Sequence, residues 1–320
     1  MPEERGLFEV ARERMRTRHL ALRTEYAYLQ WMRRYVKFHG RRHPRDLGPA
    51  EVEAFLSHLA VASKVSASTQ NQALQALLFL YRQVLGIELP WLANVTRANR
   101  PRRLPVVLSV PEVRSVLAQM DGTCWLIANL LYGSGLRLME AHRLRVKDLA
   151  LERGEVLVRD AKGGKDRVTV LPATLVAPLR DHLSKLHDRF QRQRKLGEPG
   201  VALPAALERK YPHAATQWGW QWVFPADSLC RDHYTGGSIR YHQHEKIVQR
   251  AVQMAVHKAK ILQPASCHTF RHCFATHLLR SGSDIRTVQE LLGHAELRAT
   301  MIYTHVLGKG AMGVKSPLDR

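Results

Sequence analysis

The sequence has 320 residues, of which 49 are Lys or Arg and 28 are Asp or Glu, so its net charge is +21 and its pI is near 10.4. This length is enough for about two domains. The longest apolar runs stay well short of the roughly 20 residues that cross a membrane, and no apolar core follows the acidic N-terminus, so we expect no membrane span and no secretory signal. So large a charge excess repels itself unless a polyanion neutralises it, which predicts a nucleic acid as partner.

The N-terminal part of the chain is predicted to be helical. Apolar residues recur there at three- and four-residue steps, which is the pattern of helices packed on a common core. Polar and arginine-rich faces alternate with these stripes, and they are where contacts to a DNA groove would lie. The predicted DNA-binding domain, residues 1–95, has stripes over 22–36 and 52–59, and a third helix from Ser66 or Ser68, either of which can cap it, to Gly86.

A basic segment follows at residues 96–106. Between Thr96 and Pro105 it contains two prolines and four arginines but no acidic residue, which disfavours a packed element. We interpret it as an extended linker between two domains that lies along a phosphate backbone. Its candidate DNA-binding residues are Arg97, Arg100, Arg102 and Arg103.

Residues 107–320 are predicted to form a second domain that is mostly helical with a small sheet. It opens with a capping box, because Ser109 precedes Glu112 by three residues. Alternating valines on both sides of a lysine-bearing turn predict a β-hairpin over 155–171. Helices are expected over 124–132, from 172 to 196, and at 245–261, 268–281, 284–292 and 298–306.

Polar side chains cluster near the C-terminus, where an ordinary helical core would have apolar ones. His268 and Arg271 are three residues apart, so they share one face of a helical turn. The next helix stops at Gly293, His294 follows directly, and Tyr303 comes nine residues later. Each of these features alone is common, whereas their combination is specific.

In order and spacing, these elements resemble the tyrosine recombinase family. The resemblance rests on Gly133-Ser134-Gly135-Leu136-Arg137, the lysine turn, His268 with Arg271, Leu291-Leu292-Gly293-His294 and Tyr303. It implies a two-domain architecture, mainly α with a small β-sheet, in which a helical SAM-like core-binding domain and an α+β catalytic domain form a clamp around DNA. Six catalytic positions are carried over: Arg137, Lys162, His268, Arg271, His294 and Tyr303.

The resemblance implies a strand transesterification that proceeds without metal or ATP, through a 3′-phosphotyrosine on Tyr303. Arg137 and Arg271 would hold the phosphate bidentately, since fixed cations stabilise the extra charge of the pentacovalent transition state. A tyrosine with a pKa near about 10 needs help to ionise, and His268 is the residue expected to assist. His294 would donate to a non-bridging oxygen.

The 5′-oxygen that leaves also needs a proton. Lys162 in the hairpin turn is the expected donor, and Lys165 is the competing candidate. Among the neighbours, Glu140 is predicted to orient an arginine by an ion pair, while His272, His277 and His305 are interpreted as structural or DNA-backbone contacts.

We expect neither a metal nor a cofactor. The four cysteines form no C-x-x-C pair, which indicates neither a disulfide framework nor a zinc ribbon and favours a reducing, cytoplasmic compartment. His268, His272 and Cys273 lie close together but lack the Glu of an H-E-x-x-H motif. The resemblance implies a bacterial protein associated with the nucleoid.

A second resemblance narrows the branch of the family. An insertion at about 190–240 contains Trp218, Trp220 and Trp222 within five residues, and it looks like the additional helix of integron integrases. Such enzymes recombine gene cassettes between a folded single-stranded attC hairpin and a double-stranded attI site. The resemblance suggests that Pro204 and Trp220 flank an unpaired base, on which an aromatic ring stacks favourably.

The same resemblance suggests that His242 meets another unpaired base, and we expect Trp222 to be a core residue. It also implies a homotetramer in the synaptic complex, in which the C-terminal tail docks on a neighbouring subunit. Two alternatives remain open from the sequence. One is a phage-type or chromosome-dimer-resolving recombinase that acts on duplex sites, and the other is a DNA-binding regulator that has lost catalysis.

Overall fold

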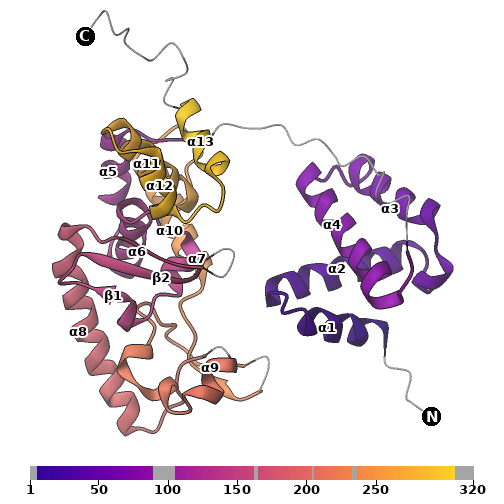
Figure 1. Cartoon of the computed structure of the whole chain (residues 1–320), viewed down its shortest axis with the longest axis horizontal. Coiled ribbons are helices and arrows are strands. Elements are labelled where there is room, and N and C mark those ends of the chain that lie inside the picture. Colours follow the sequence, from indigo (N-terminus) through magenta and orange to yellow (C-terminus); the bar gives the residue numbers. More distant parts are fainter. Residues whose placement is uncertain (1–5, 89–104, 162–164, 204, 233–235, 307–320) are drawn as a thin grey trace, which may run out of the picture. The chain divides into compact units, whose positions relative to one another are not determined.

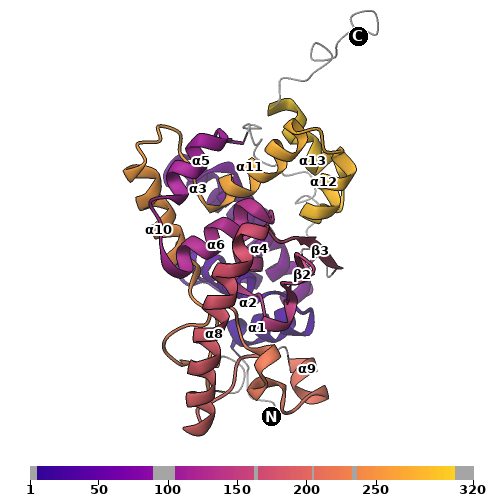
Figure 2. The same ribbon diagram turned by 90° about the vertical axis from the view of Figure 1, so that its left-hand side faces the viewer.

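The computed structural model describes residues 6–88, 105–161, 165–203, 205–232 and 236–306. Contacts within the chain divide it into two compact units, residues 1–103 and 104–320. Both are dominated by helices, and the strands of the described residues all belong to the second unit (Figures 1 and 2). In the described part of the chain, no helix is both long and apolar enough to span a membrane.

Over residues 6–88, the first unit is a bundle of four α-helices whose apolar faces meet in one core. As the sequence predicts, Ser66 is an N-cap, and its hydroxyl accepts a hydrogen bond from the amide of Thr69. The fourth helix ends in a π-helical segment that stops at Gly86, which has the left-handed conformation. The elements are α1 (Leu7–Thr17), α2 (Leu22–Phe38), α3 (Pro49–Val61), α4 (Ala67–Phe79) and the π-helix Leu80–Leu85.

The second unit is built around α6 (Gly122–Gly133), an apolar helix whose buried side chains lie at the centre of the core. It contacts α5, α7, α8, α10 and α11. The predicted capping box begins α5, since the amide of Ser109 donates to the carboxylate of Glu112 at 2.7 Å. These helices are α5 (Val110–Leu117), α7 (Leu138–His142), α8 (Ala173–Lys195), α10 (Glu245–Lys258) and α11 (Cys267–Arg280).

An antiparallel sheet of three strands, β1 (Leu149–Ala150), β2 (Glu155–Ala161) and β3 (Lys165–Val170), covers one side of this core. The predicted hairpin is formed by β2 and β3.

Valines alternate with polar residues along β3, and the polar residues are the ones that face inward. Val168 and Val170 are exposed, whereas the Thr169 side chain is buried and its hydroxyl donates to the carbonyl oxygen of Ser134 at 2.8 Å. Arg167, two residues before Thr169, also points inward. Successive side chains of β3 point to opposite faces of the sheet. The inner face packs on polar groups of the site described below, and the two valines therefore point outward.

The segment between α8 and α10 packs against the C-terminal half of α8 (Figures 1 and 2). Trp218 attaches it there, because its ring meets those of His187 and Phe190 at centroid distances of 4.7 and 5.4 Å. Among the described residues this segment contains α9 (Ala205–Lys210) and a two-stranded sheet of β4 (Cys230–Arg231) and β5 (Ser238–Ile239).

The C-terminal helices α12 (Ile285–Leu292) and α13 (Leu297–Val306) pack on α11 and on each other. A small apolar cluster of Phe274, Leu279, Val288 and Leu292 joins them, and the ring of Tyr303 is part of it. This packing places α12 beside β3, where the polar residues of the sequence motifs converge.

Candidate active site

Arg137 is positioned by the start of α7. Its backbone amide donates to Oε2 of Glu140 at 2.8 Å, which closes a capping box, and its Nη1 donates to Oε1 of the same carboxylate at 2.7 Å. The Arg137 side chain is about a quarter exposed, at 26%. The side chain is therefore held by Glu140 and is still partly open to solvent.

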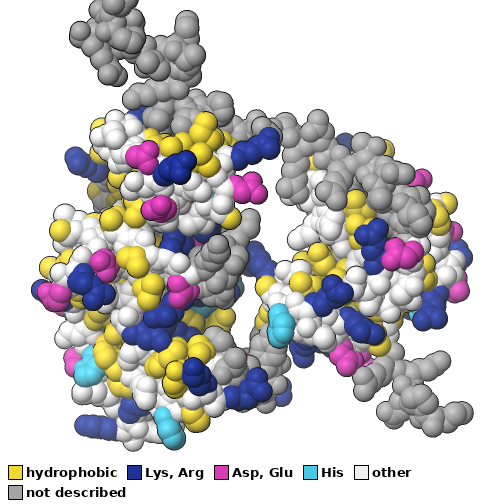
Figure 3. All heavy atoms as spheres, in the orientation of Figure 1, with side chains coloured by type: hydrophobic (Ala, Val, Ile, Leu, Met, Phe, Trp, Pro, Cys, Tyr) yellow, Lys and Arg dark blue, Asp and Glu magenta, His cyan; other side chains and the backbone are white. Residues whose placement is uncertain are grey.

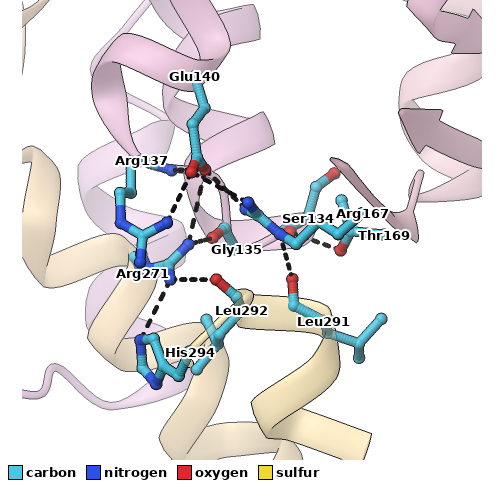
Figure 4. Close-up of polar contacts among 10 residues, drawn as sticks. All are labelled: Ser134, Gly135, Arg137, Glu140, Arg167, Thr169, Arg271, Leu291, Leu292 and His294. Carbon is cyan, nitrogen blue, oxygen red and sulfur yellow. Dashed lines mark hydrogen bonds and ion pairs between the residues drawn. The ribbon is translucent and has the colours of Figure 1, made fainter. Parts of the chain in front are cut away.

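Glu140 is the centre of the site, because three arginines converge on its carboxylate (Figure 4). Arg167 reaches it from β3 with two hydrogen bonds, Nη1 to Oε1 at 3.0 Å and Nη2 to Oε2 at 2.6 Å. Arg271 reaches it from α11 as an ion pair of 3.7 Å. The orienting role predicted for Glu140 is thus confirmed, and Arg167 is an addition that the sequence did not indicate.

The charge of Glu140 is fixed by its surroundings. Burial by itself would raise the pKa of this carboxyl, but the hydrogen bonds and charge of Arg167, together with the hydrogen bonds from Arg137, lower it to about 2. The carboxylate is therefore ionised at neutral pH. It partly offsets the mutual repulsion of three guanidinium groups that are held close together.

Arg271 is almost completely buried, at 1% exposure. Its guanidinium donates to the carbonyl oxygens of Gly135 and Leu292, the latter at 2.6 Å. Burial, followed by the charge of Arg137, lowers the pKa of Arg271. One residue of α11 thereby ties the glycine turn after α6 to the end of α12.

Two glycines make this close approach possible. Gly135 has φ +64°, and a Cβ there would lie 2.4 Å from the Phe274 ring. Gly293 has φ +62°, and a Cβ there would lie 2.7 Å from Cδ of Arg167. Left-handed backbone disfavours other L-residues, and here the space for a side chain is also absent. The glycines of both sequence motifs are therefore required by the arginine site.

His294 contacts Arg271 directly. Its Nε2 accepts from Nη2 of Arg271 at 3.2 Å, and its Nδ1 lies 2.9 Å from the hydroxyl of Thr300. Burial, followed by the charges of Arg271 and Arg137, lowers the pKa of His294 to about 4. The ring is therefore neutral at pH 7, which is the form that accepts a hydrogen bond from the guanidinium.

Tyr303 lies in the same site. Its ring is 2% exposed, and it is nearly parallel to the ring of His294 at a centroid distance of 6.3 Å. Burial raises the pKa of Tyr303, and the positive charges of Arg271 and then Arg137 act in the opposite direction. The phenol and the two guanidinium groups predicted to act together therefore sit within electrostatic range in one protomer.

His272 makes its contact within the site. The sequence predicted a structural or DNA-backbone contact for this residue, and its Nδ1 lies 3.1 Å from the hydroxyl of Tyr303. The prediction placed His268 beside the tyrosine, and its ring instead meets His272 edge-on at 4.4 Å. The i, i+4 spacing of two histidines on one helix face is the sequence signal that would have identified this pair.

His277 has the structural role that the sequence predicted. Its Nε2 lies 3.0 Å from the carbonyl oxygen of Leu108, and its Nδ1 lies 3.0 Å from the hydroxyl of Tyr132. The residue fastens α11 to the beginning of the second unit.

Several predicted site residues lie outside the described part of the chain. The backbone of Lys165 begins β3, but its side chain is not among those described. The predicted site residues that lie wholly outside the described part of the chain are Lys162, Pro204, Arg97, Arg100, Arg102 and Arg103.

The insertion brings aromatic and basic groups together. Trp222 is buried at 5%, which confirms it as a core residue, and the Arg145 guanidinium lies 3.1 Å from its ring centroid. Trp220 is half-buried. The Lys147 ammonium lies 2.8 Å from the Trp220 ring centroid, an arrangement that attracts the cation to the π-face.

His242 does not present a stacking face to solvent. It is 5% exposed, and its ring is enclosed by those of Tyr241, Trp222 and His142 at centroid distances of 4.2, 5.4 and 5.6 Å. A base could not stack on this ring without displacing its neighbours. Basic side chains are spread over the surface of both units in the face that Figure 3 shows.

Known proteins are similar to this one in sequence and in fold. Residues 7–91 match the profile of the phage integrase N-terminal SAM-like domain, and residues 108–309 match that of the phage integrase family. A protein named Integrase/recombinase from Escherichia coli is 52% identical over 308 residues, covering 96% of this chain and 91% of that protein. Tyrosine recombinase XerA from Thermococcus kodakarensis is 32% identical over 283 residues, covering 87% and 83%.

Solved structures agree in fold. A lambda integrase dimer bound to a core site gives a TM-score of 0.61 at 15% identity, covering 95% of this chain and 96% of that chain. XerH recombinase in a pre-cleavage complex with its difH substrate gives a TM-score of 0.60 at 19% identity, covering 98% and 86%. From the matched profiles and the curated relatives, this chain belongs to the phage integrase family and is a tyrosine site-specific recombinase.

Proposed function

We propose that Tyr303 attacks a DNA phosphate and forms a 3′-phosphotyrosine, while Arg137 and Arg271 bind the non-bridging oxygens. The observation that carries this proposal is the convergence of both guanidinium groups on Glu140, with His294 between Arg271 and the ring of Tyr303. Guanidinium groups fixed before the substrate binds need little reorganisation as charge develops on phosphorus, which is the main source of such electrostatic stabilisation.

The remaining catalytic residues have separate roles in this proposal. His294 exchanges its contact with Arg271 for one with a phosphate oxygen, to which its Nε2 donates in the tautomer whose Nδ1 accepts from the hydroxyl of Thr300. His268 lies next to His272 and supports the ionisation of Tyr303 through it. Lys162, assigned by the family resemblance, protonates the 5′-oxygen as it leaves, and Lys165 is the alternative donor.

A suicide oligonucleotide with a nick beside the cleavage point tests the chemistry, because the short leaving strand diffuses away and traps the covalent intermediate. The protein should form a protein–DNA adduct that survives denaturing electrophoresis, and Tyr303→Phe should form none. Failure of the unsubstituted protein to form an adduct on any family substrate would instead support a catalytically inactive DNA-binding regulator.

We also propose that the substrates are those of an integron integrase, a folded single-stranded attC hairpin and a double-stranded attI site. The support is Trp220, whose ring is placed next to Lys147 and 6.3 Å from that of Tyr211. An unpaired base can stack on such a ring, for about 1–3 kcal/mol per base, while the ammonium group neutralises a neighbouring phosphate. Pro204 completes this contact in the family resemblance.

His242 is not included as a base contact, because its ring is buried. The four linker arginines remain proposed DNA-backbone contacts. They would act through charge and not through sequence.

The second candidate is a recombinase that acts on two double-stranded sites, and the 32% identity to Tyrosine recombinase XerA supports it. The two candidates differ in a single comparison. Covalent trapping should be faster on a folded attC bottom strand than on the same sequence as a duplex. Equal rates on the two forms would favour the duplex-site recombinase.

We further propose a division into a core-binding domain at 1–95, a linker at 96–106 and a catalytic domain at 107–320, with four protomers in the synaptic complex. The two compact units support the division. Deletion of residues 309–320 should leave binding to one site intact and abolish the pairing of two sites. Unchanged pairing in a gel-shift assay would contradict the proposed role of the tail.

A further inference from the structure

His272 and Tyr303 face each other across the contact between α11 and α13. Nδ1 of His272 lies 3.1 Å from the phenolic oxygen, and the ring centroids are 5.6 Å apart. Among the residues that the structure describes, His272 is the one hydrogen-bond partner of this hydroxyl. The phenol is 2% exposed, so bulk water has little access to its proton.

The chemistry of the contact follows from the charge state of the imidazole. Burial, then the neighbouring His268 and Arg271, lower the pKa of His272 to about 4. At neutral pH the ring therefore carries one N–H and one lone pair. A phenol has a single hydrogen to donate, so the productive arrangement has the N–H at Nε2 and the lone pair at Nδ1, directed at Tyr303.

Burial raises the pKa of Tyr303, and the positive charges around its hydroxyl act against this by favouring movement of the proton away from oxygen. The titratable and charged groups around the pair are His268 and Arg271 on α11 and His294 after α12. Arg271 and Arg137 also stabilise a negative charge on the phenolic oxygen of Tyr303. Positive charge beside the phenol favours phenolate, and a neutral imidazole in contact with it is available as a base.

We propose that His272 is a further catalytic residue, whose Nδ1 accepts the phenolic hydrogen of Tyr303 as the phenolic oxygen attacks phosphorus. The inference rests on the proposed role of Tyr303 as the nucleophile. His268 then acts one step away, by contact with the His272 ring, and is a positioning residue for this proton transfer. In the described part of the chain, no hydrogen bond joins His268 to Tyr303.

The step balances in both directions. During cleavage the O–H bond of Tyr303 breaks, an N–H bond forms on His272, the phenolic oxygen bonds to phosphorus, and the bond to the 5′-oxygen breaks. The 5′-oxygen receives its proton from the separate donor proposed above. During rejoining an incoming 5′-hydroxyl returns its proton to that same donor as its oxygen bonds to phosphorus, the bond between phosphorus and the Tyr303 oxygen breaks, and this oxygen recovers its hydrogen from the His272 imidazolium.

A suicide oligonucleotide with sulfur in place of the bridging 5′-oxygen isolates this step, because a thiolate leaves without a proton. The measured quantity is the rate of adduct formation by the full-length protein between pH 6 and 8. Without substitution the rate should be independent of pH, since a base with the low pKa of His272 stays unprotonated throughout. His272→Gln keeps a hydrogen-bonding group but cannot take up a proton.

We expect His272→Gln to be at least about 100-fold slower at pH 7, the lower end of what general-base catalysis contributes. Its rate should rise about tenfold per pH unit, because the phenol, with a pKa near 10 in water, must then ionise by itself. A rate that is merely lower and still independent of pH would overturn the proposal. So would an unchanged rate.

His277→Gln is the matched control, because His277 makes the same kind of contact from the same helix, Nδ1 to the hydroxyl of Tyr132 at 3.0 Å. It should retain a pH-independent rate, and a pH slope in this variant would mean that loosening of α11 explains the effect. If His272→Gln does not fold, His272→Ala decides the matter. Added imidazole should raise its rate in proportion to concentration, and no response would contradict the proposal.

These outcomes separate the two proposals. If the unsubstituted protein forms no adduct, the nucleophilic role of Tyr303 fails. If it forms the adduct and His272→Gln reacts at the same rate, only the inference about His272 fails.

Discussion

Replacing Glu140 with Gln should destabilise the second unit and disorganise the arginine site. The carboxyl has its pKa lowered to about 2, from an ordinary value of 4.5. Each pKa unit corresponds to about 1.4 kcal/mol, so its ionisation contributes about 3 kcal/mol to the free energy of unfolding at pH 7. The side chain is only 9% exposed. Removing its charge leaves the buried arginines without a counter-charge, which costs a similar amount of unfolding free energy.

The sign of the pH dependence is also fixed. A carboxyl whose folded pKa is depressed stabilises the fold above its unfolded pKa, and this stabilisation is lost as the pH falls toward 2. Urea unfolding of the full-length protein should therefore give a free-energy difference between Glu140→Gln and the unsubstituted protein that narrows by about 2 kcal/mol between pH 7 and pH 3.

A matched control is available in Glu155, whose side chain is 42% exposed and pairs with Arg153 at 2.9 Å. Glu155→Gln should change the free energy of unfolding by less than about 0.5 kcal/mol, as exposed ion pairs usually do. If Glu140→Gln changed the free energy of unfolding as little as this control does, or if that change did not depend on pH, the reasoning about the three arginines would be refuted.

The remaining predictions concern the glycine turn, the insertion and salt. Gly135→Ala should lower the free energy of unfolding, measured by thermal unfolding, by about 3 kcal/mol or more, because its Cβ would lie 2.4 Å from the Phe274 ring. Gly154 has nearly the same φ but no atom closer than 3.6 Å to such a Cβ, so Gly154→Ala should lower it by about 1–2 kcal/mol. Trp220→Ala should weaken equilibrium binding of an attC hairpin about 5- to 150-fold, with little change for a duplex; Trp222→Ala should lower stability, by about 3–5 kcal/mol. Binding of a duplex site should weaken by about 10³-fold or more from 50 to 200 mM salt if at least six phosphates are contacted, and a salt-independent affinity would contradict the electrostatic account.

Local signals in the sequence were sufficient for much of the fold. The capping box at Ser109 and the N-cap at Ser66 depend on atoms within three residues of each other, so spacing alone identifies them. The hairpin was also predictable from its turn. Which face of the hairpin points inward was not predictable. Val168 and Val170 are exposed because the other face of β3 meets a polar site, and the sequence does not show that contact.

The candidate site shows the same limit. Arg271 and Glu140 stand in recognisable motifs, and the orienting role of Glu140 follows from its spacing from Arg137 at the start of α7. Arg167 has no such signal, since its partner is 27 residues away and is brought near by the packing of β3 on α7. The contact of His272 with Tyr303 has no such signal either, because the two residues are 31 positions apart and meet only through the packing of α13 on α11.

The central claim is that the phenolic oxygen of Tyr303 becomes bonded to a DNA phosphate, and mass spectrometry of the trapped adduct tests it most directly. After nuclease and protease digestion, the peptide that contains Tyr303 should carry a nucleotide through its 3′-phosphate. An adduct on any other residue, or an adduct that still forms in Tyr303→Phe, would contradict the claim.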